Sequence, residues 1–376
     1  SSLSRHSMSK NPFLAVPGLL SLILSACAPT PSPEVAPTPA RMPKASEVRE
    51  TSGNAPGAYS APGVGGDYRG YASMNAFIER MVTDHGFTRD YLCGLFSEAR
   101  RKSWTIEYMN REKPQVRPKP GGWSRYRAKF LDDRHIDAGV RFWSLHAEAL
   151  ARAERTYGVP PEIVLGILGV ETIYGANLGN HRVLDALTTL AFDYPRRADY
   201  FSEELQNLLL MAREEGFDPV KPVGSFAGAM GLGQFMPGSF LKYAVDFDGD
   251  GRRDLWNPED AIGSIAHYFH SFGWREGAPV ETRAQVTGRL GGDVKDGFDT
   301  RYSLKALAAL GIRPDAAVSE SSGPFSLLRL STNQGEEDRI GFPNFYVITR
   351  YNHSTYYAMA VHELGQAIRR RREARF

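Results

Sequence analysis

The sequence predicts an α+β fold that is predominantly α-helical, with a small β-containing subdomain at about residues 300–350. Apolar residues recur every three to four positions through most of the chain after residue 70, which is the period of an amphipathic helix. Short strand-like runs occur late, at Phe325–Leu330 and Phe345–Tyr351, with turn residues at 333–335 between them. The chain has 376 residues, 42% hydrophobic and 23% charged. These values are typical of a globular protein with room for two or three domains.

The N-terminal residues 1–26 have the features of a signal peptide. Phe13–Leu24 is mostly apolar, but Pro17 and Gly18 interrupt it and it is too short to span a bilayer comfortably. Residues 24–27, LSAC, resemble the lipobox of bacterial lipoproteins. The resemblance implies cleavage before Cys27, lipid attachment to Cys27, and a protein anchored in the outer membrane and facing the periplasm. The alternative is an ordinary cleaved signal with a chance cysteine.

Residues 27–68 are expected to form the lipidated cysteine and a disordered tether. Positions 28–66 contain eight prolines, five glycines and one aromatic residue. Such a segment cannot offset the entropy of ordering by burying apolar surface. The globular region is therefore expected at residues 69–376.

Helical patterns fill most of that region. The helix at 137–157 is expected to place Val140, Trp143, Leu145, Ala149 and Leu150 inward, and Pro161 is expected to start the next helix, because proline is tolerated in a first turn. The remaining helices are expected at residues 74–82, 89–101, 184–192, 198–215, 258–273 and 355–372.

The charge balance and the cysteine count exclude some classes of protein. Forty-five Lys and Arg oppose 43 Asp and Glu, so the net charge is +2. A dedicated nucleic-acid binder needs a concentrated basic surface, and this balance argues against one. Two cysteines cannot make a disulfide scaffold. Cys93 lies among apolar residues and is interpreted as an inert buried thiol.

The helix Pro161–Gly175 carries a carboxylic acid on an apolar face. Glu171 shares that face with the apolar residues that precede it at helical spacing. Burial raises the pKa of a carboxyl group, which keeps a proton available for general acid catalysis, as in lysozyme. Gly166 and Gly169 allow another element to approach closely. The alternative is a structural Glu satisfied by an arginine or by a helix N-terminus.

The segment Gly224–Phe240 contains five glycines in 17 residues and is not expected to form a stable helix by itself. It suits the floor of a cleft, where a polymer lies against the main chain. Ser225 and Gln234 could hydrogen-bond the hydroxyl or acetamido groups of a sugar. The alternative is an ordinary close contact between helices.

The segment Asp246–Asp260 resembles a calcium-binding loop. Its first residues, DFDGDG, match positions 1, 3, 5 and 6 of an EF-hand, in which alternating carboxylates surround one hard cation. Position 12 is Asn257 where a bidentate Glu belongs, and Asp260 could complete the shell in a longer loop. The alternative is a solvated acidic turn.

Together these segments resemble the membrane-bound lytic murein transglycosylase B family, bacterial enzymes that cleave peptidoglycan. The similar stretches run from about Trp123 to Leu364, and include YGVPPE from Tyr157, GVET from Gly169, PRR from Pro195 and TRYNHS from Thr349. The resemblance implies a lysozyme-like catalytic core at about 155–275, accompanied by an additional α region and the small β-containing subdomain.

The resemblance also implies roles for individual residues. Glu171 matches the family's single catalytic acid. The positions that match substrate-binding residues are Tyr126, Arg196, Arg197, Ser225, Gln234, Tyr268, Tyr351, Asn352 and Tyr357. The positions that match ligands of one structural calcium ion are Asp246, Asp248, Asp250, Asp260 and the carbonyl of Arg252. The late ligand Asp260 is typical of the family, which accounts for Asn257 at position 12.

The implied reaction needs one carboxyl group, because water is not the acceptor. Glu171 would protonate the oxygen between N-acetylmuramic acid and N-acetylglucosamine and then accept the proton of the muramic acid C6 hydroxyl, leaving a 1,6-anhydro end. The implied partners are peptidoglycan strands and a membrane reached through Cys27. Two alternatives stay open: a lysozyme-like hydrolase, and a non-catalytic peptidoglycan-binding lipoprotein.

Overall fold

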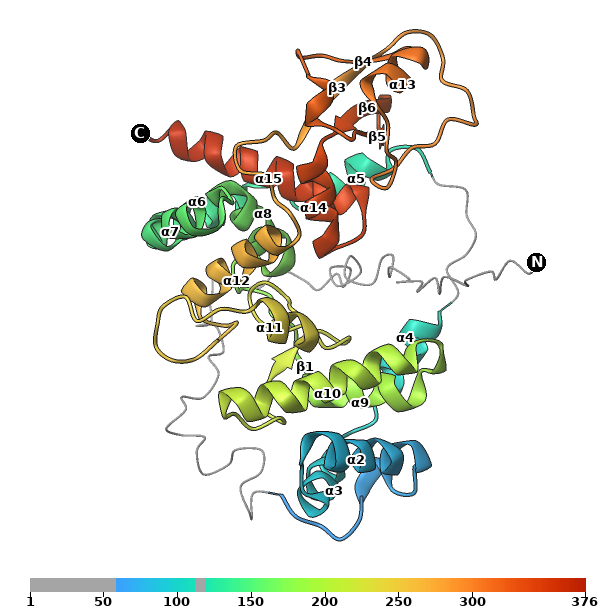
Figure 1. Cartoon of the computed structure of the whole chain (residues 1–376), viewed down its shortest axis with the longest axis vertical. Coiled ribbons are helices and arrows are strands. Elements are labelled where there is room, and N and C mark those ends of the chain that lie inside the picture. Colours follow the sequence, from blue (N-terminus) through green and yellow to red (C-terminus); the bar gives the residue numbers. More distant parts are fainter. Residues whose placement is uncertain (1–58, 112–118) are drawn as a thin grey trace, which may run out of the picture.

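The structure, a computed structural model, describes residues 59–111 and 119–376. It confirms a predominantly helical fold with a small sheet. Figure 1 shows α2 and α3 at one end of the molecule, the four-stranded sheet with α13 at the other, and most of the remaining helices between them. No helix within the described residues combines the length and the apolar character needed to cross a membrane.

The helices are α2 (Ala72–His85), α3 (Arg89–Ser97), α4 (Ser103–Asn110), α5 (Gly122–Ala128), α6 (Asp133–Leu145), α7 (Ala147–Tyr157), α8 (Pro161–Thr172), α9 (Val183–Asp193), α10 (Ala198–Glu215), α11 (Pro237–Tyr243), α12 (Pro258–Ser271), α13 (Leu304–Ala309), α14 (Pro343–Tyr351) and α15 (Thr355–Glu373). Three 3-10 helices are η2 (Gly66–Tyr68), η3 (Pro195–Arg197) and η4 (Glu320–Ser322). The strands are β1 (His181–Arg182), β2 (Val223–Gly224), β3 (Glu281–Val286), β4 (Ile312–Pro314), β5 (Ser326–Thr332) and β6 (Gly335–Gly341).

The larger sheet is antiparallel, with strand order β4-β3-β6-β5. It encloses its own small core, which includes Leu307, Phe325 and Ile340. An ion pair between Arg339 of β6 and Glu281 of β3, at 3.1 Å, lies where the sheet meets α15, and His362 Nε2 of α15 is 3.4 Å from the same Glu281. The sheet is thereby tied to the helical body.

Helix α8 lies at the centre of the helical body. Nearly all of its residues are buried, and α15 packs along it (Figure 1). A Cβ atom on Gly166 would collide with the carbonyl oxygen of Val361, and one on Gly365 would collide with that of Glu162. Gly166 therefore permits the close approach that the sequence predicted, with Gly365 supplying the matching gap on α15.

Three local predictions are wrong. The expected helix 137–157 is two helices, α6 and α7, which meet at His146 with φ −124° and ψ 27°. Leu145, expected inward, is 77% exposed, because the break turns the end of α6 out of register with the core. Residues 345–351 form the helix α14 rather than a strand, and the sheet instead begins earlier, at β3.

Residues 59–68, expected in the tether, are packed. The Tyr59 hydroxyl donates to the Asp218 carboxylate at 2.8 Å, and Tyr68 is fully buried. A Cβ atom on Gly94 would collide with the backbone of Ser60, so α3 receives this segment closely. The signal peptide, Cys27 and the rest of the expected tether lie outside the described residues.

Candidate active site

Glu171 lies in the last turn of the buried helix α8. The helix ends at Thr172 rather than at residue 175, because Ile173 and Tyr174 adopt left-handed backbone conformations, with φ values of 50° and 56°. The Thr172 hydroxyl donates to the Leu232 carbonyl at 2.8 Å, which fastens the helix end to the glycine-rich segment. Glu171 itself is half-buried. Its carboxyl group thus combines an apolar setting with access from outside.

Tyr357 is the hydrogen-bond partner of Glu171. Its hydroxyl donates to Glu171 Oε1 at 2.5 Å, and its side chain is 2% exposed. Tyr357 lies in the first turn of α15, where the Ser354 hydroxyl accepts its backbone N–H at 3.2 Å. The close crossing of α8 and α15 therefore brings together two side chains that are 186 positions apart.

The protonation states favour proton donation by Glu171. Burial raises the pKa of Glu171 to about 8, and the hydrogen bond from Tyr357 partly opposes that rise. The carboxyl group is therefore mostly protonated at neutral pH. Burial, followed by the nearby charge of Glu171, raises the pKa of both Tyr351 and Tyr357 well above the ordinary value. Both phenols therefore stay protonated and keep donating their hydrogen bonds as long as the side chains stay in place.

An aromatic wall borders this carboxyl group. The rings of Tyr268 and Tyr351 meet edge to face at 4.9 Å, and Phe235 lies 6.0 Å from each of them. The Tyr351 hydroxyl donates to the Gly233 carbonyl at 2.5 Å, and the Tyr268 hydroxyl donates to the Arg350 carbonyl at 2.6 Å. Because both hydroxyls are held by backbone groups, this wall is rigid.

The glycine-rich segment forms turns and the short strand β2, without a helix before Pro237. Ser225 and Gln234 are both buried within it. Ser225 Oγ accepts the Ala229 N–H at 2.9 Å, and Gln234 Nε2 donates to the Gly231 carbonyl at 2.9 Å. Gln234 has a φ of 55°, which is uncommon outside glycine. In this structure the two side chains hold the segment in shape.

The other predicted substrate residues lie around the same region, at different depths. Tyr126 of α5 contributes to the raised pKa of Tyr357 and is thus its neighbour. Asn352 is buried directly after α14. Arg197 stacks over the Tyr200 ring at 4.2 Å, and Arg196 is exposed on η3. The structure therefore groups Tyr126, Tyr351 and Tyr357 with Glu171, whereas the two arginines lie on a separate element.

The sequence reasoning did not single out a second buried carboxyl group, that of Glu204 on α10. Glu204 Oε2 accepts the Gly238 N–H at 2.8 Å, and burial raises the pKa of Glu204 to about 7. Its position between Phe201 and Leu208 on the apolar face of α10 was the available signal. Because this carboxyl group satisfies the start of α11, its role is structural.

The four aspartates of the acidic loop converge. One carboxylate oxygen from each of Asp246, Asp248, Asp250 and Asp260 lies within 4.8 Å of the others. Burial, together with the neighbouring charges of Asp250 and Asp246, raises the pKa of Asp248. Oxygen ligands at this density suit a hard cation such as Ca²⁺. The donor set therefore fits the ion that the sequence predicted.

Asn257 starts a helix in place of ligating. Its Oδ1 accepts the N–H groups of Glu259 and Asp260, at 2.9 and 3.2 Å, as the N-cap of α12. Asp260 is 1% exposed and accepts the N–H groups of Phe247 and Asp254, at 2.7 and 2.9 Å. The loop thus runs three residues longer than a twelve-residue EF-hand loop and ends inside the first turn of α12. Arg252, whose carbonyl was a predicted ligand, lies in this loop and donates its N–H to Asp250 Oδ1 at 2.9 Å.

Comparison with known proteins shows which family has a similar sequence and structure. Residues 70–366 match the family described as "Transglycosylase SLT domain". The chain is 46% identical over 354 residues to membrane-bound lytic murein transglycosylase B of Escherichia coli K12, which covers 93% of this chain and 95% of the relative.

Solved structures of bacterial lytic transglycosylases are also similar to this chain. The Escherichia coli lytic transglycosylase Slt35 in complex with calcium is 49% identical, with a TM-score of 0.77, covering 83% of this chain and 97% of that one. SltB3 of Pseudomonas aeruginosa in complex with NAG-anhNAM-pentapeptide is 28% identical, with a TM-score of 0.70, covering 79% and 78%. The predicted lysozyme-like class of fold and the predicted reaction class are confirmed. The chain belongs to the transglycosylase SLT-domain family and is a peptidoglycan lytic transglycosylase.

Proposed function

We propose that Glu171 is the catalytic acid and base that cleaves the β-1,4 bond between N-acetylmuramic acid and N-acetylglucosamine. The observation that carries the proposal is a single protonated carboxyl group in an apolar site. Its raised pKa arises from burial and is moderated by Tyr357, and no second carboxylate within the described chain contributes to it. Most glycosidases use two carboxylates, so a lone acid favours a reaction in which the nucleophile comes from the substrate.

The Glu171 carboxyl group alone can carry out both proton transfers of the reaction. Glu171 donates its proton to the glycosidic oxygen as the C1–O bond of the muramic acid breaks. The C6 hydroxyl of the same sugar then attacks C1, and its proton passes to the Glu171 carboxylate. The product carries a 1,6-anhydro ring and the acid is regenerated. Tyr357, which donates to Oε1, orients the carboxyl group and stabilises its charged form between the two steps.

The aromatic wall and the glycine-rich segment would hold the sugars. Tyr126, Tyr268 and Tyr351 offer ring edges, whereas the glycines of the segment are buried within the protein, Gly231 against Leu255 and Gly233 against the Tyr351 hydroxyl. The full set of proposed substrate contacts is Tyr126, Arg196, Arg197, Ser225, Gln234, Tyr268, Tyr351, Asn352 and Tyr357. The catalytic core would extend over about residues 155–275.

The products of digestion test this mechanism. Purified peptidoglycan is treated with the enzyme and the fragments are analysed by mass spectrometry. Muropeptides ending in 1,6-anhydromuramic acid are expected, each lighter by one water than the product of hydrolysis. Reducing ends would instead identify a lysozyme-like hydrolase, and the absence of any fragments would indicate a binding protein.

We infer that the acidic loop binds one structural calcium ion. Asp246, Asp248, Asp250, Asp260 and the Arg252 carbonyl would hold it, and the bond-breaking steps do not need it. The convergence of four carboxylates and the calcium complex of Slt35 support the assignment. The ion would stabilise the approach to α12, which carries Tyr268 in the aromatic wall.

We infer also that the protein is anchored in the outer membrane by lipid at Cys27 and faces the periplasm. The membrane-bound name of the Escherichia coli relative supports membrane association. In a bacterial host, Cys27→Ser is expected to move the protein out of the detergent phase, whereas Cys93→Ser, at the buried thiol, leaves it there. An unchanged partition of Cys27→Ser would overturn the lipid anchor.

A further inference from the structure

Four aromatic rings gather where α4 meets β1 and the glycine-rich segment. Trp104 and Tyr108 lie on successive turns of α4, and their ring centres are 5.1 Å apart with an angle of 21° between the ring planes. His181 of β1 stacks against Trp104 at 5.7 Å. Phe226 meets Trp104 and Tyr108 edge to face, at 5.9 and 5.0 Å. These four residues are called the Trp104 cluster below.

The Trp104 cluster has a buried base and an exposed rim. Phe226 is 5% exposed, Tyr108 and His181 are half-buried, and Trp104 is 49% exposed. Because three neighbouring rings hold the indole of Trp104, little side-chain entropy remains to be lost when a ligand covers it. A large aromatic side chain that is both exposed and fixed is therefore suited to binding a ligand.

The rings of the cluster are uncharged at neutral pH. Burial, followed by the charge of Lys102, lowers the pKa of His181 below its ordinary value of 6.5, so the imidazole is neutral. The guanidinium group of Arg111 lies 5.5 Å from the centre of the Tyr108 ring and offers hydrogen-bond donors at the edge of the cluster. Apolar ring surface beside polar donors matches a sugar, which has C–H groups on the face of its ring and hydroxyl groups around it.

The cluster lies on the same backbone ladder as the aromatic wall of the proposed catalytic site. Successive antiparallel pairings join Phe235 to Met230, Met230 to Gly224, and Gly224 to His181. Neighbouring chains of such a ladder are about 4.8 Å apart, so roughly 14 Å separates the backbone of Phe235 in the wall from that of His181 in the cluster. This distance corresponds to a few sugar residues of an extended strand.

The chain that follows Glu171 leads to the cluster as well. His181 comes ten positions after Glu171, and between them the Leu178 carbonyl accepts a hydrogen bond from Gln234 Nε2 at 3.5 Å. Gln234 is one of the proposed sugar contacts. The cluster therefore continues the row of proposed sugar contacts in the direction away from the catalytic acid.

We propose that the Trp104 cluster is an outer sugar-binding subsite, at which the glycan strand stacks on the indole of Trp104 at a distance from the bond that is cleaved. The inference rests on the proposed function, because it takes the strand to be held at Glu171. A polymeric substrate extends beyond the scissile bond, so its outer sugars can add affinity without taking part in bond cleavage. Trp104 is accordingly a substrate-binding residue and not a catalytic one.

Substrate length tests the proposal. Long peptide-free glycan strands are compared with the shortest peptide-free oligosaccharide that the wild-type enzyme cleaves, and cleavage of the short substrate reports on the proposed function separately. In Trp104→Ala, KM for long strands is expected to rise about tenfold with kcat unchanged, whereas both constants on the short substrate keep their wild-type values. Trp104→Phe keeps a stacking ring and should recover most of the affinity, which separates stacking from a defect in folding.

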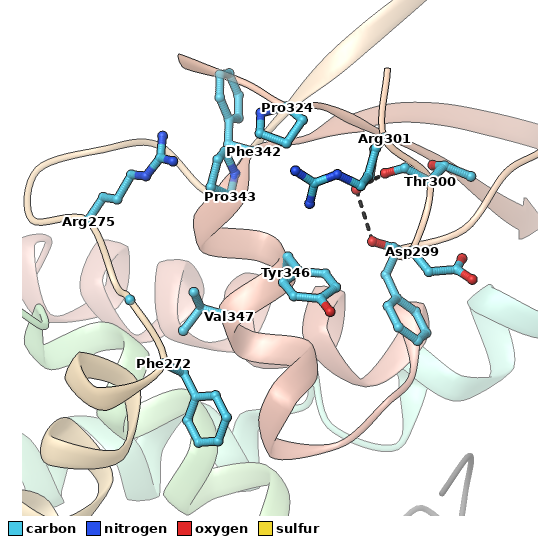
Figure 2. Close-up of a pocket in the computed structure, with 13 residues that line it drawn as sticks. Phe272, Arg275, Asp299, Thr300, Arg301, Pro324, Phe342, Pro343, Tyr346 and Val347 are labelled. Atoms are coloured by element: carbon cyan, nitrogen blue, oxygen red, sulfur yellow. Dashed lines mark hydrogen bonds between the residues drawn. The ribbon is translucent and has the colours of Figure 1, made fainter. Parts of the chain in front are cut away.

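An exposed aromatic residue outside the cluster serves as the matched control. Figure 2 shows Tyr346 of α14 in a separate pocket of about 280 Å³, between Arg275 and Arg301. Tyr346 is 39% exposed, and the guanidinium group of Arg350 lies 4.0 Å from the centre of its ring. Tyr346→Ala is expected to leave KM unchanged for both substrates.

Direct binding provides the second measurement. Long peptide-free strands are titrated by calorimetry into Glu171→Gln and into the double variant Glu171→Gln/Trp104→Ala. The double variant is expected to bind about tenfold more weakly at low and high salt alike, because ring stacking is not screened by ions. Continued cleavage by Glu171→Gln would contradict the proposed function and leave the length comparison in place.

Two outcomes would overturn the outer subsite. The first is an unchanged KM and an unchanged affinity for long strands in the Trp104→Ala variants. The second is an equal loss on short and long substrates, since Trp104 would then support the fold or the site of cleavage itself.

Discussion

The site at Glu171 and the acidic loop use the same functional group in opposite ways. At Glu171 one carboxyl group lies in apolar surroundings with one phenol as its partner, and burial raises its pKa to about 8. In the loop, four carboxylates converge within 4.8 Å, and Asp248 and Asp250 are exposed. Isolation from water retains a proton in the first case, whereas crowding of charges attracts a cation in the second.

This difference indicates that the number of neighbouring polar groups determines whether a carboxyl group of this protein retains a proton or attracts a cation. Glu171 has few polar contacts, so the free energy of burying its side chain depends on whether the carboxyl group is protonated. The loop carboxylates accept many backbone N–H groups, which fix their positions before any ion arrives, as Asp246 accepts those of Asp250 and Gly251 at 3.1 and 2.8 Å. A substitution should therefore affect chemistry at the first site and stability at the second.

The largest effect is expected for Glu171→Gln on turnover. The amide keeps the shape of the side chain but cannot donate an acidic proton, so kcat should fall about 10³-fold. The release of soluble muropeptides measures the loss, and circular dichroism checks the fold. Glu148→Gln, at an exposed acid on α7, is the control and keeps wild-type activity. Near-normal turnover in Glu171→Gln would show that another group supplies the proton.

The same substitution should stabilise the protein at neutral and alkaline pH. The folded-state pKa of Glu171, about 8, exceeds its ordinary value of 4.5. Unfolding therefore releases a proton between these values, and wild-type stability declines as pH rises from about 4.5 to 8. Glu171→Gln lacks this decline. Its free energy of unfolding should therefore exceed that of the wild type by on the order of 2–4 kcal/mol at pH 8, and should equal it at pH 4. Denaturant unfolding at both pH values measures the gain, and an equal effect at both would contradict it.

Calcium should raise the melting temperature of chelator-treated protein. An ion that binds the folded state alone, at about 100 times its Kd, adds about 2.7 kcal/mol, which is roughly 5 °C here. Asp250→Ala should lose most of that rise yet still cleave peptidoglycan at low temperature. Asp84→Ala, at an exposed acid on α2, should keep the rise. If chelation abolished turnover without lowering the melting temperature, the ion would have a catalytic role.

The smallest effect is expected for Tyr357→Phe. Its hydroxyl lowers the pKa of Glu171, so removing it should raise that pKa further. Because the acid must be protonated, kcat/KM falls as pH rises through this pKa. The alkaline limb should therefore move upward by about one pH unit, with a modest loss of kcat. Tyr356→Phe, at the adjacent tyrosine, should leave the alkaline limb in place. An unmoved limb in Tyr357→Phe would show that the Tyr357 hydroxyl does not affect the pKa of Glu171.

Much of this arrangement could be predicted from the sequence because it is local. The apolar face around Glu171 and the alternating aspartates of the loop are patterns within one element, and both are present. The end of α8 was missed because Ile173 and Tyr174 adopt left-handed conformations that β-branched and aromatic residues rarely take. The hydrophobic run at 345–351 fits strand and helix alike, and only packing against the sheet and α15 decides for the helix α14.

The partners of the site residues were beyond local patterns. Ser225 and Gln234 have hydrogen-bonding groups that suit a sugar, yet their bonds to Ala229 and Gly231 become visible only once the segment is folded.

The hydrogen bond between Tyr357 and Glu171 also sets an order of events. Its two residues are 186 positions apart, so the contact forms only after nearly the whole globular region has been synthesised and α15 has docked on α8. Contacts of such long sequence separation form late in folding, since the chain must first lose the entropy of closing a large loop. A nascent or partly folded chain therefore holds the acid without the phenol that orients it. The oriented form of the Glu171 carboxyl group is thus a property of the fully assembled fold.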